Sequence, residues 1–157
     1  EKNIELIDEI DSRLISLMSV EDLKSFESAE VVEMQALNSY EQAIVLIQKD
    51  DVEGALTALN VYIQNAEESD QTALAYYWLG ELNIANGNLA IAAQNLNTLI
   101  GLYPAHWRVP HAKYQLGLIH LEQGDKDRAI AQFESVIRDF PESSPAKASR
   151  ESLSSLE

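Results

Sequence analysis

The chain has 157 residues, of which 46% are hydrophobic, and it carries a formal net charge of −15. This length and apolar content suit one compact domain or a short array of repeats and argue against wholesale disorder. The negative charge disfavours nucleic acid and anionic lipid as partners, and the absence of cysteine excludes disulfides, thiol nucleophiles and cysteine-ligated metals.

The acidic residues are concentrated in the N-terminal half of the chain. Residues 1–35 hold ten acids and three bases, and residues 36–72 hold seven acids and one base. A field of this sign favours a basic partner, although a net charge of this size also serves solubility alone.

Residues 1–35 make the first segment. Apolar side chains recur there at a spacing of three and four residues for about two heptads, which predicts a short helix. The residues in this pattern are Ile7, Ile10, Leu14 and Leu17. This helix is either the remnant of a coiled coil, through which the chain would form a homo-oligomer, or a cap docked on the segment that follows.

Residues 36–144 repeat every 37 residues. The period defines three units, over residues 36–72, 73–109 and 110–144, and the last two match in register at Gly80 and Gly117, Gly87 and Gly124, Ala92 and Ala129, Pro104 and Pro141. Apolar spacing predicts two helices in each unit, and in the last two units it predicts the turn between them at Gly87 and at Gly124. The first unit lacks this glycine and the closing proline, and we expect its turn at Asp50-Asp51. Such a period is typical of stacked helical hairpins.

Residues 145–157 close the array. Ser144 followed by Pro145 predicts a helix start, with Ser144 as the N-cap. Leucine and alanine residues of this helix would face inward, and serine and charged residues would face water, as a terminal capping helix requires.

The two later units resemble tetratricopeptide repeats. One copy of that motif is filled by Leu79-Gly80, Gly87, Ala92, Leu96 and Pro104, and the next by Leu116-Gly117, Gly124, Ala129, Phe133 and Pro141. The resemblance implies an all-α fold: a right-handed superhelical solenoid of three α-hairpins with an N-terminal helix and a C-terminal capping helix. It also implies a protein that binds a protein or peptide partner.

A narrower resemblance rests on the longer spacing and on two runs, Tyr-Trp-Leu-Gly-Glu-Leu at residues 77–82 and Phe-Pro-Glu-Ser-Ser-Pro-Ala-Lys-Ala at residues 140–148. These look like the Tol–Pal-associated periplasmic cell-division coordinator family of Gram-negative bacteria (YbgF/CpoB), over residues 36–156. The resemblance implies a periplasmic protein that binds Tol-system proteins and couples outer-membrane constriction to septal peptidoglycan synthesis. Related repeat proteins of outer-membrane assembly share similar motifs, and a cytoplasmic location stays open.

In a stack of such hairpins, the first helix of each unit lines a concave wall, and four of its positions project into the groove. One of these positions is tyrosine in all three units. We therefore expect an apolar groove with a row of tyrosines that holds an amphipathic helix or an extended segment. Its residues are Leu37, Tyr40, Ile44, Leu74, Tyr77, Glu81, His111, Tyr114 and Leu118. The alternative is that the tyrosines only pack between adjacent units.

Trp107 lies in the long turn between Pro104 and Pro110. An exposed tryptophan in a stiffened loop would be an anchor for a partner. The alternative is that the ring tucks under its own loop.

The sequence contains no catalytic motif. The three histidines lack metal-site spacing, and no phosphate-binding loop or nucleophile elbow occurs. We expect no enzyme activity, no cofactor and no metal, and the lack of an apolar run of roughly 18–20 residues predicts no direct membrane insertion. Two functions remain: an adaptor that binds a partner protein, and a structural oligomerisation module built from the N-terminal helix and the groove.

Overall fold

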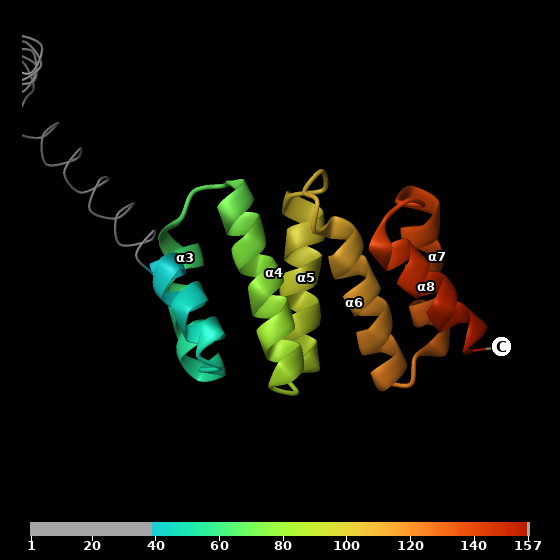
Figure 1. The fold of residues 1–157 in the computed structure, drawn as a ribbon, viewed down its shortest axis with the longest axis horizontal. Helices are drawn as coiled ribbons and strands as arrows, with labels where there is room; N and C mark the ends of the chain where they lie inside the picture. Colours follow the sequence, from blue (N-terminus) through green and yellow to red (C-terminus); the bar gives the residue numbers. More distant parts are fainter. Residues whose placement is uncertain (1–38, 157) are drawn as a thin grey trace, which may run out of the picture.

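A computed structural model describes residues 39–156, so that the predicted N-terminal helix, Leu37 and Glu157 lie outside the described residues. The described part is helical throughout and contains no strand (Figure 1). Its elements are a helix over residues 39–48, α3 (Val52–Asn65), α4 (Asp70–Ala85), α5 (Leu89–Leu102), α6 (Val109–Glu122), α7 (Lys126–Asp139) and α8 (Ser144–Ser154). The predicted all-α solenoid of helical hairpins is confirmed.

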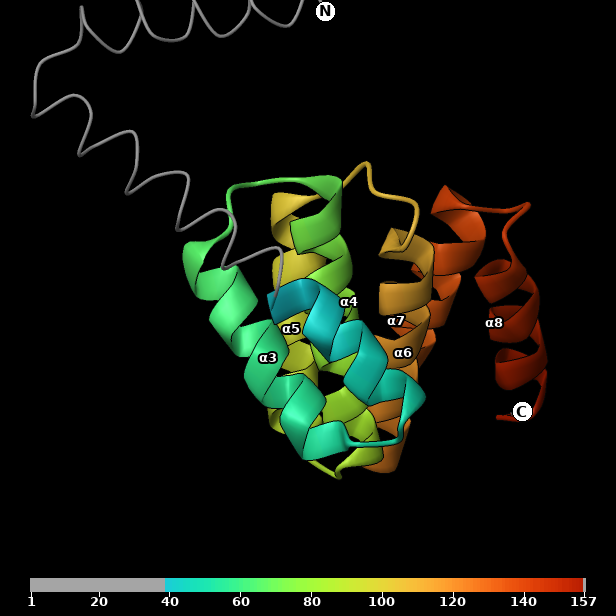
Figure 2. The ribbon, with the colours of Figure 1, turned by 60° about the vertical axis from the view of Figure 1, so that its left-hand side comes forward.

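The helices alternate between two layers (Figures 1 and 2). The helix over residues 39–48, α4, α6 and α8 make one layer, and we call its outer surface the first-helix face. Helices α3, α5 and α7 make the other layer, whose outer surface we call the second-helix face. Both α4 and α6 pack against the second helix of their own hairpin and against that of the preceding hairpin, so the hairpins stack in chain order.

Short polar side chains begin most of the helices. The prediction that Ser144 is the N-cap of the last helix is wrong by one residue, because Ser143 Oγ accepts the hydrogen bond from the Ala146 N–H at 3.2 Å. Pro145 fits the first turn, where a backbone N–H has no intrahelical partner to lose. Side-chain caps of the same kind begin α3, α4 and α7, at Asp51, Ser69 and Asp125.

The turn inside each hairpin needs one residue in the left-handed backbone conformation. Gly87 and Gly124 provide it with φ angles of 75° and 79°, and Asp50 takes the equivalent place in the first hairpin with a φ angle of 59°. Aspartate adopts this conformation more readily than most residues that carry a Cβ. The first unit therefore keeps the turn geometry of the other two without their glycine.

The apolar core is shared between neighbouring hairpins. One buried cluster joins Leu59 and Tyr62 of α3 to Leu79 of α4. A second cluster joins Leu96 of α5 to residues of α4 and to Leu116 of α6. Each hairpin therefore completes its core only with the first helix of the next one.

Two glycines allow the helices of a hairpin to approach closely. A Cβ on Gly80 would lie 2.5 Å from Cδ2 of Leu96, and a Cβ on Gly117 would overlap the ring of Phe133. Leu96 and Phe133 are fully buried, so neither side chain can move aside without displacing its own neighbours. These positions therefore require glycine for steric reasons.

We predict that Gly117→Ala destabilises the protein by about 1 kcal/mol or more, because overpacking against Phe133 outweighs the gain in helix propensity. Gly101→Ala is the matched control, since Gly101 is exposed on α5 and an added Cβ would meet nothing within 4 Å. This control should gain up to about 1 kcal/mol. Urea unfolding followed by circular dichroism measures both variants, and equal stabilities would contradict the close approach at Gly117.

Candidate protein-binding surface

The predicted site residues within the described part lie on the first-helix side of the molecule. Tyr40 and Ile44 are on the helix over residues 39–48, Leu74, Tyr77 and Glu81 on α4, His111, Tyr114 and Leu118 on α6, and Trp107 in the loop before α6. Tyr77 is buried, with 7% of its surface exposed, and the other predicted residues on the helices are half-buried. The repeat spacing thus places these residues together, but they do not form a row of exposed rings.

The outer two of the three tyrosines pack against aromatic side chains of the scaffold. The ring centroid of Tyr40 lies 5.2 Å from that of Tyr62 on α3. The ring centroid of Tyr114 lies 5.6 Å from that of Phe133, and its hydroxyl oxygen is 3.4 Å from Ser152 Oγ on α8. Both tyrosines therefore contribute to packing between helices.

Tyr77 joins the second hairpin to the third. Its ring lies edge-on to the ring of His111 on α6, at 6.4 Å between centroids. The guanidinium of Arg108, in the loop before α6, lies 4.5 Å from the centroid of the Tyr77 ring. This buried ring is thus held by Arg108 of the loop before α6 and by His111 of α6, which is the geometry of the packing alternative.

Arg108 is a candidate binding residue that motif reasoning missed. Its guanidinium carbon stacks over two rings, 4.5 Å from the centroid of Tyr77 and 4.2 Å from that of Trp107. Within residues 39–156 no oxygen accepts a hydrogen bond from this guanidinium, and its Nε is buried without a partner. The Nη donors of the guanidinium therefore remain available for a carboxylate or carbonyl oxygen of a ligand.

Trp107 is the most exposed of the large hydrophobic side chains in the described part, with 59% of its surface accessible. Its ring contacts the Arg108 guanidinium on one side and lies 6.2 Å from the His111 ring, centroid to centroid. The ring is therefore held in place while much of its surface faces water. We call Trp107 and Arg108, together with Tyr77 and His111, the Trp–Arg cluster.

A polar network borders the Trp–Arg cluster. Gln115 Nε2 on α6 donates a hydrogen bond of 2.8 Å to Glu81 Oε1 on α4. Burial raises the pKa of the Glu81 carboxyl group, while hydrogen bonds from Gln115 and Tyr77 act in the opposite direction. Burial, together with the nearby Glu81 charge, raises the pKa of the Tyr77 phenol to about 12. Glu81 thus places a partly desolvated acid about one helical turn from Tyr77.

Two histidines, His106 and His111, lie beside this surface. His106 is buried, and its Nδ1 accepts a hydrogen bond from the Arg108 N–H at 3.2 Å. Burial lowers the pKa of both His106 and His111. The negative charge of Asp70 opposes this shift at His106, and the positive charge of Arg108 lowers the pKa of both rings. No group of three or more His, Cys, Asp or Glu residues within 39–156 could hold a metal ion.

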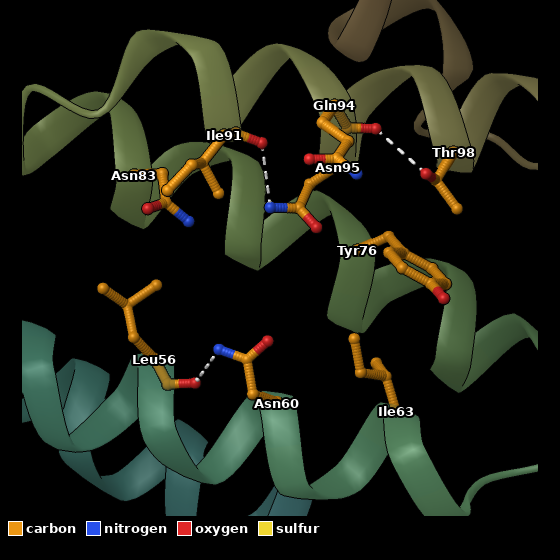
Figure 3. Close-up of a pocket in the computed structure, with 9 residues that line it drawn as sticks. All are labelled: Leu56, Asn60, Ile63, Tyr76, Asn83, Ile91, Gln94, Asn95 and Thr98. Carbon is orange, nitrogen blue, oxygen red and sulfur yellow. Dashed lines mark hydrogen bonds between the residues drawn. The ribbon is translucent and has the colours of Figure 1, made fainter.

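A pocket lies on the opposite side of the molecule, in the second-helix face. It has a volume of about 430 Å³ and lies between α3 and α5, with α4 behind them (Figure 3). Its lining residues are Leu56, Asn60 and Ile63 from α3, Tyr76 and Asn83 from α4, and Ile91, Gln94, Asn95 and Thr98 from α5. None of the predicted site residues that the structure describes lines this pocket.

Two sequence signals could have indicated these features. No charged residue occurs in α5, although an exposed helix face normally carries charges. Arg108 is isolated in the sequence, because residues 50–107 contain neither lysine nor arginine. The uncharged helix α5 thus indicates the pocket, and the isolated base indicates Arg108 as a binding residue, whereas the repeat motif indicates neither.

Comparisons with known proteins bear on the fold. Models of the tetratricopeptide repeat match residues 40–106 and residues 111–143. A solved structure, described as the crystal structure of MamA, is similar to the chain with a TM-score of 0.59 and 22% sequence identity, over 79% of this chain and 76% of that chain. At this identity the likeness concerns the fold alone. The comparison with curated proteins gave no match. Among the helices of residues 39–156, none has the length and apolar character to cross a membrane.

We predict that Glu81 makes stability depend on pH. Because burial raises the pKa of Glu81, the folded state keeps this proton to a higher pH than the unfolded chain does. The free energy of unfolding should therefore fall as the pH rises from the ordinary glutamate range, about 4.3, through the raised pKa. Glu81→Gln should lose this fall, as measured by urea unfolding at several pH values. Glu134→Gln, at an exposed position of α7, corrects for the loss of one negative charge.

Proposed function

Because this chain belongs to the tetratricopeptide repeat family, we propose that it is a non-catalytic adaptor that binds a segment of a partner protein on its first-helix face. The single observation that carries the proposal is the Trp–Arg cluster. There an exposed tryptophan and an arginine without an acceptor are stacked on each other. Tryptophan and arginine are the side chains that most often dominate the energetics of protein interfaces.

The stacking prepares Trp107 for binding. The Arg108 guanidinium, 4.2 Å from the centroid of the Trp107 ring, restricts the rotamers of both side chains before a partner arrives. Less side-chain entropy is then lost on association. A partner that covers the exposed 59% of Trp107 would gain the burial of a large apolar ring at low entropic cost.

The donors of Arg108 complement the apolar contact. Residues 73–109 contain one acid, Glu81, and one base, Arg108. The Glu81 carboxylate accepts a hydrogen bond from Gln115 and acts on Arg108 only through its charge. A carboxylate or backbone carbonyl of the partner would accept from the guanidinium, next to the apolar contact on Trp107. The half-buried residues Leu74, Tyr114 and Leu118 extend this surface along α4 and α6.

We predict that Trp107→Ala lowers affinity for the partner about tenfold or more without unfolding the protein, because truncating an interface tryptophan commonly costs at least that much. The partner would first be trapped from bacterial envelope extract by a photo-crosslinking phenylalanine at Ala105, which is exposed in the same loop, so that Trp107 stays in place. The same crosslinker at Ala131, exposed on α7 of the second-helix face, is the matched control.

A partner that crosslinks from position 105 and not from position 131, and that binds Trp107→Ala more weakly, supports the proposal. Equal crosslinking from both positions, or unchanged affinity of Trp107→Ala, refutes the first-helix face as the binding surface. Circular dichroism of the variant distinguishes lost binding from lost folding.

We also propose that the adaptor works in the periplasm, where it binds Tol-system proteins and links envelope constriction to peptidoglycan synthesis during cell division. The support is the resemblance of residues 77–82 and 140–148 to the Tol–Pal-associated family. The acidic surface and the lack of cysteine agree with such a location without requiring it.

For this second proposal we predict that a tagged chain expressed in a Gram-negative cell appears in the periplasmic fraction and co-purifies with Tol proteins after crosslinking. Loss of the protein should delay constriction of the outer membrane relative to the septum, as seen by fluorescence microscopy. Recovery of the chain in the cytoplasmic fraction, or co-purification without Tol proteins, would contradict the assignment.

A further inference from the structure

The pocket of the second-helix face has a polar character that follows from its hydrogen bonds. Asn60 Nδ2 donates to the Leu56 carbonyl oxygen at 2.8 Å, and Asn95 Nδ2 donates to the Ile91 carbonyl oxygen at 3.0 Å. A carbonyl oxygen bonds only to a donor, so these contacts determine which side of each amide is nitrogen. The amide oxygens of Asn60 and Asn95 consequently point into the space between α3 and α5 from opposite walls (Figure 3).

Other donors of the pocket are also used within their own helices. Asn83 Nδ2 donates to the Leu79 carbonyl oxygen at 2.7 Å, and the Thr98 hydroxyl donates to the Gln94 carbonyl oxygen at 2.9 Å. The two asparagine oxygens that face each other therefore offer hydrogen-bond acceptors to whatever enters. A ligand that brings donors fits these two oxygens.

The rest of the lining carries no charge and combines apolar side chains with those of Tyr76, Asn83, Gln94 and Thr98. Leu56 on α3 and Ile91 on α5, whose surface is 50% exposed, make an apolar part at one end of the pocket, and Ile63 lies at the other end beside Tyr76. A long aliphatic chain that ends in a donor group would satisfy both the apolar part and the facing oxygens.

The charge of the helices that form the pocket favours a cationic donor. Residues 50–107, which include both walls, contain no lysine or arginine and seven acids: Asp50, Asp51, Glu53, Glu67, Glu68, Asp70 and Glu81. None of these acids lines the pocket, and Glu81 lies on the first-helix side. The potential over this part of the chain is therefore negative, which attracts a basic segment. No base of the chain's own competes for the pocket from these residues.

We propose that this pocket binds the side chain of a lysine or arginine that a basic segment of a partner protein presents. The aliphatic stem lies between Leu56 and Ile91, and the cationic head lies between the amide oxygens of Asn60 and Asn95. The site is on the face opposite the Trp–Arg cluster, so a test of this site is independent of a test of the proposed adaptor function.

The test uses the full chain and two blocked tripeptides, Gly-Lys-Gly and Gly-norleucine-Gly, which differ in the ammonium group. Nitrogen–proton NMR spectra report the side-chain amides of Asn60 and Asn95 directly during titration. The lysine peptide should shift both signals and the norleucine peptide should not.

The double variant Asn60→Asp, Asn95→Asp turns the two oxygens into charged acceptors and should bind the lysine peptide about tenfold more tightly or better. Backbone amides of the pocket helices report binding to this variant.

Asn97→Asp is the matched control, because Asn97 is exposed on α5 outside the pocket lining and adds a charge two residues from Asn95. Its affinity for the lysine peptide should stay within about twofold of the parent chain, since an exposed charge is screened. The proposal is overturned if both peptides shift the same signals, if neither does, or if the double variant gains no more affinity than Asn97→Asp.

Discussion

Everything in this structure depends on the sharing of one apolar core between consecutive hairpins. Leu79 of α4 is buried with α3 of the preceding unit, and Tyr77 of the same helix is buried with α5 and α6. Helix α4 is therefore buried on two sides and has no single apolar stripe. A hairpin taken alone would expose one of these sides to water, at a cost of about 25 cal/mol for each Å² of apolar surface.

The same stacking leaves two outer faces with different chemistry. On the first-helix face, α4 contributes Tyr77 and Glu81 to the surroundings of the exposed Trp107. On the second-helix face, the same helix contributes Tyr76 and Asn83 to an uncharged pocket that is rich in acceptors. One helix thus supports both candidate sites, and a ligand on either face would contact side chains anchored in the same core.

The repeat motif predicted more of the fold than of the site. Glycine at positions 80 and 117 implied close helix approach, and the steric contacts with Leu96 and Phe133 give that implication its physical cause. The motif also placed Tyr77 on the first-helix side, but spacing alone does not reveal that a neighbouring loop covers the ring. Arg108 does so from outside the helical pattern, at the end of the loop before α6, so periodicity contained no information about its position.

By itself, the sequence determined the helical hairpins, their period and their turns. These features depend on local helix propensity and on the spacing of apolar residues and glycines, which is visible in the sequence. The tertiary structure alone decided which side chains of the outer faces meet. Two such meetings are the stacking of Arg108 over the rings of Tyr77 and Trp107 and the facing oxygens of Asn60 and Asn95. The distance between the elements that carry these side chains is set by packing, and no spacing along the chain encodes it.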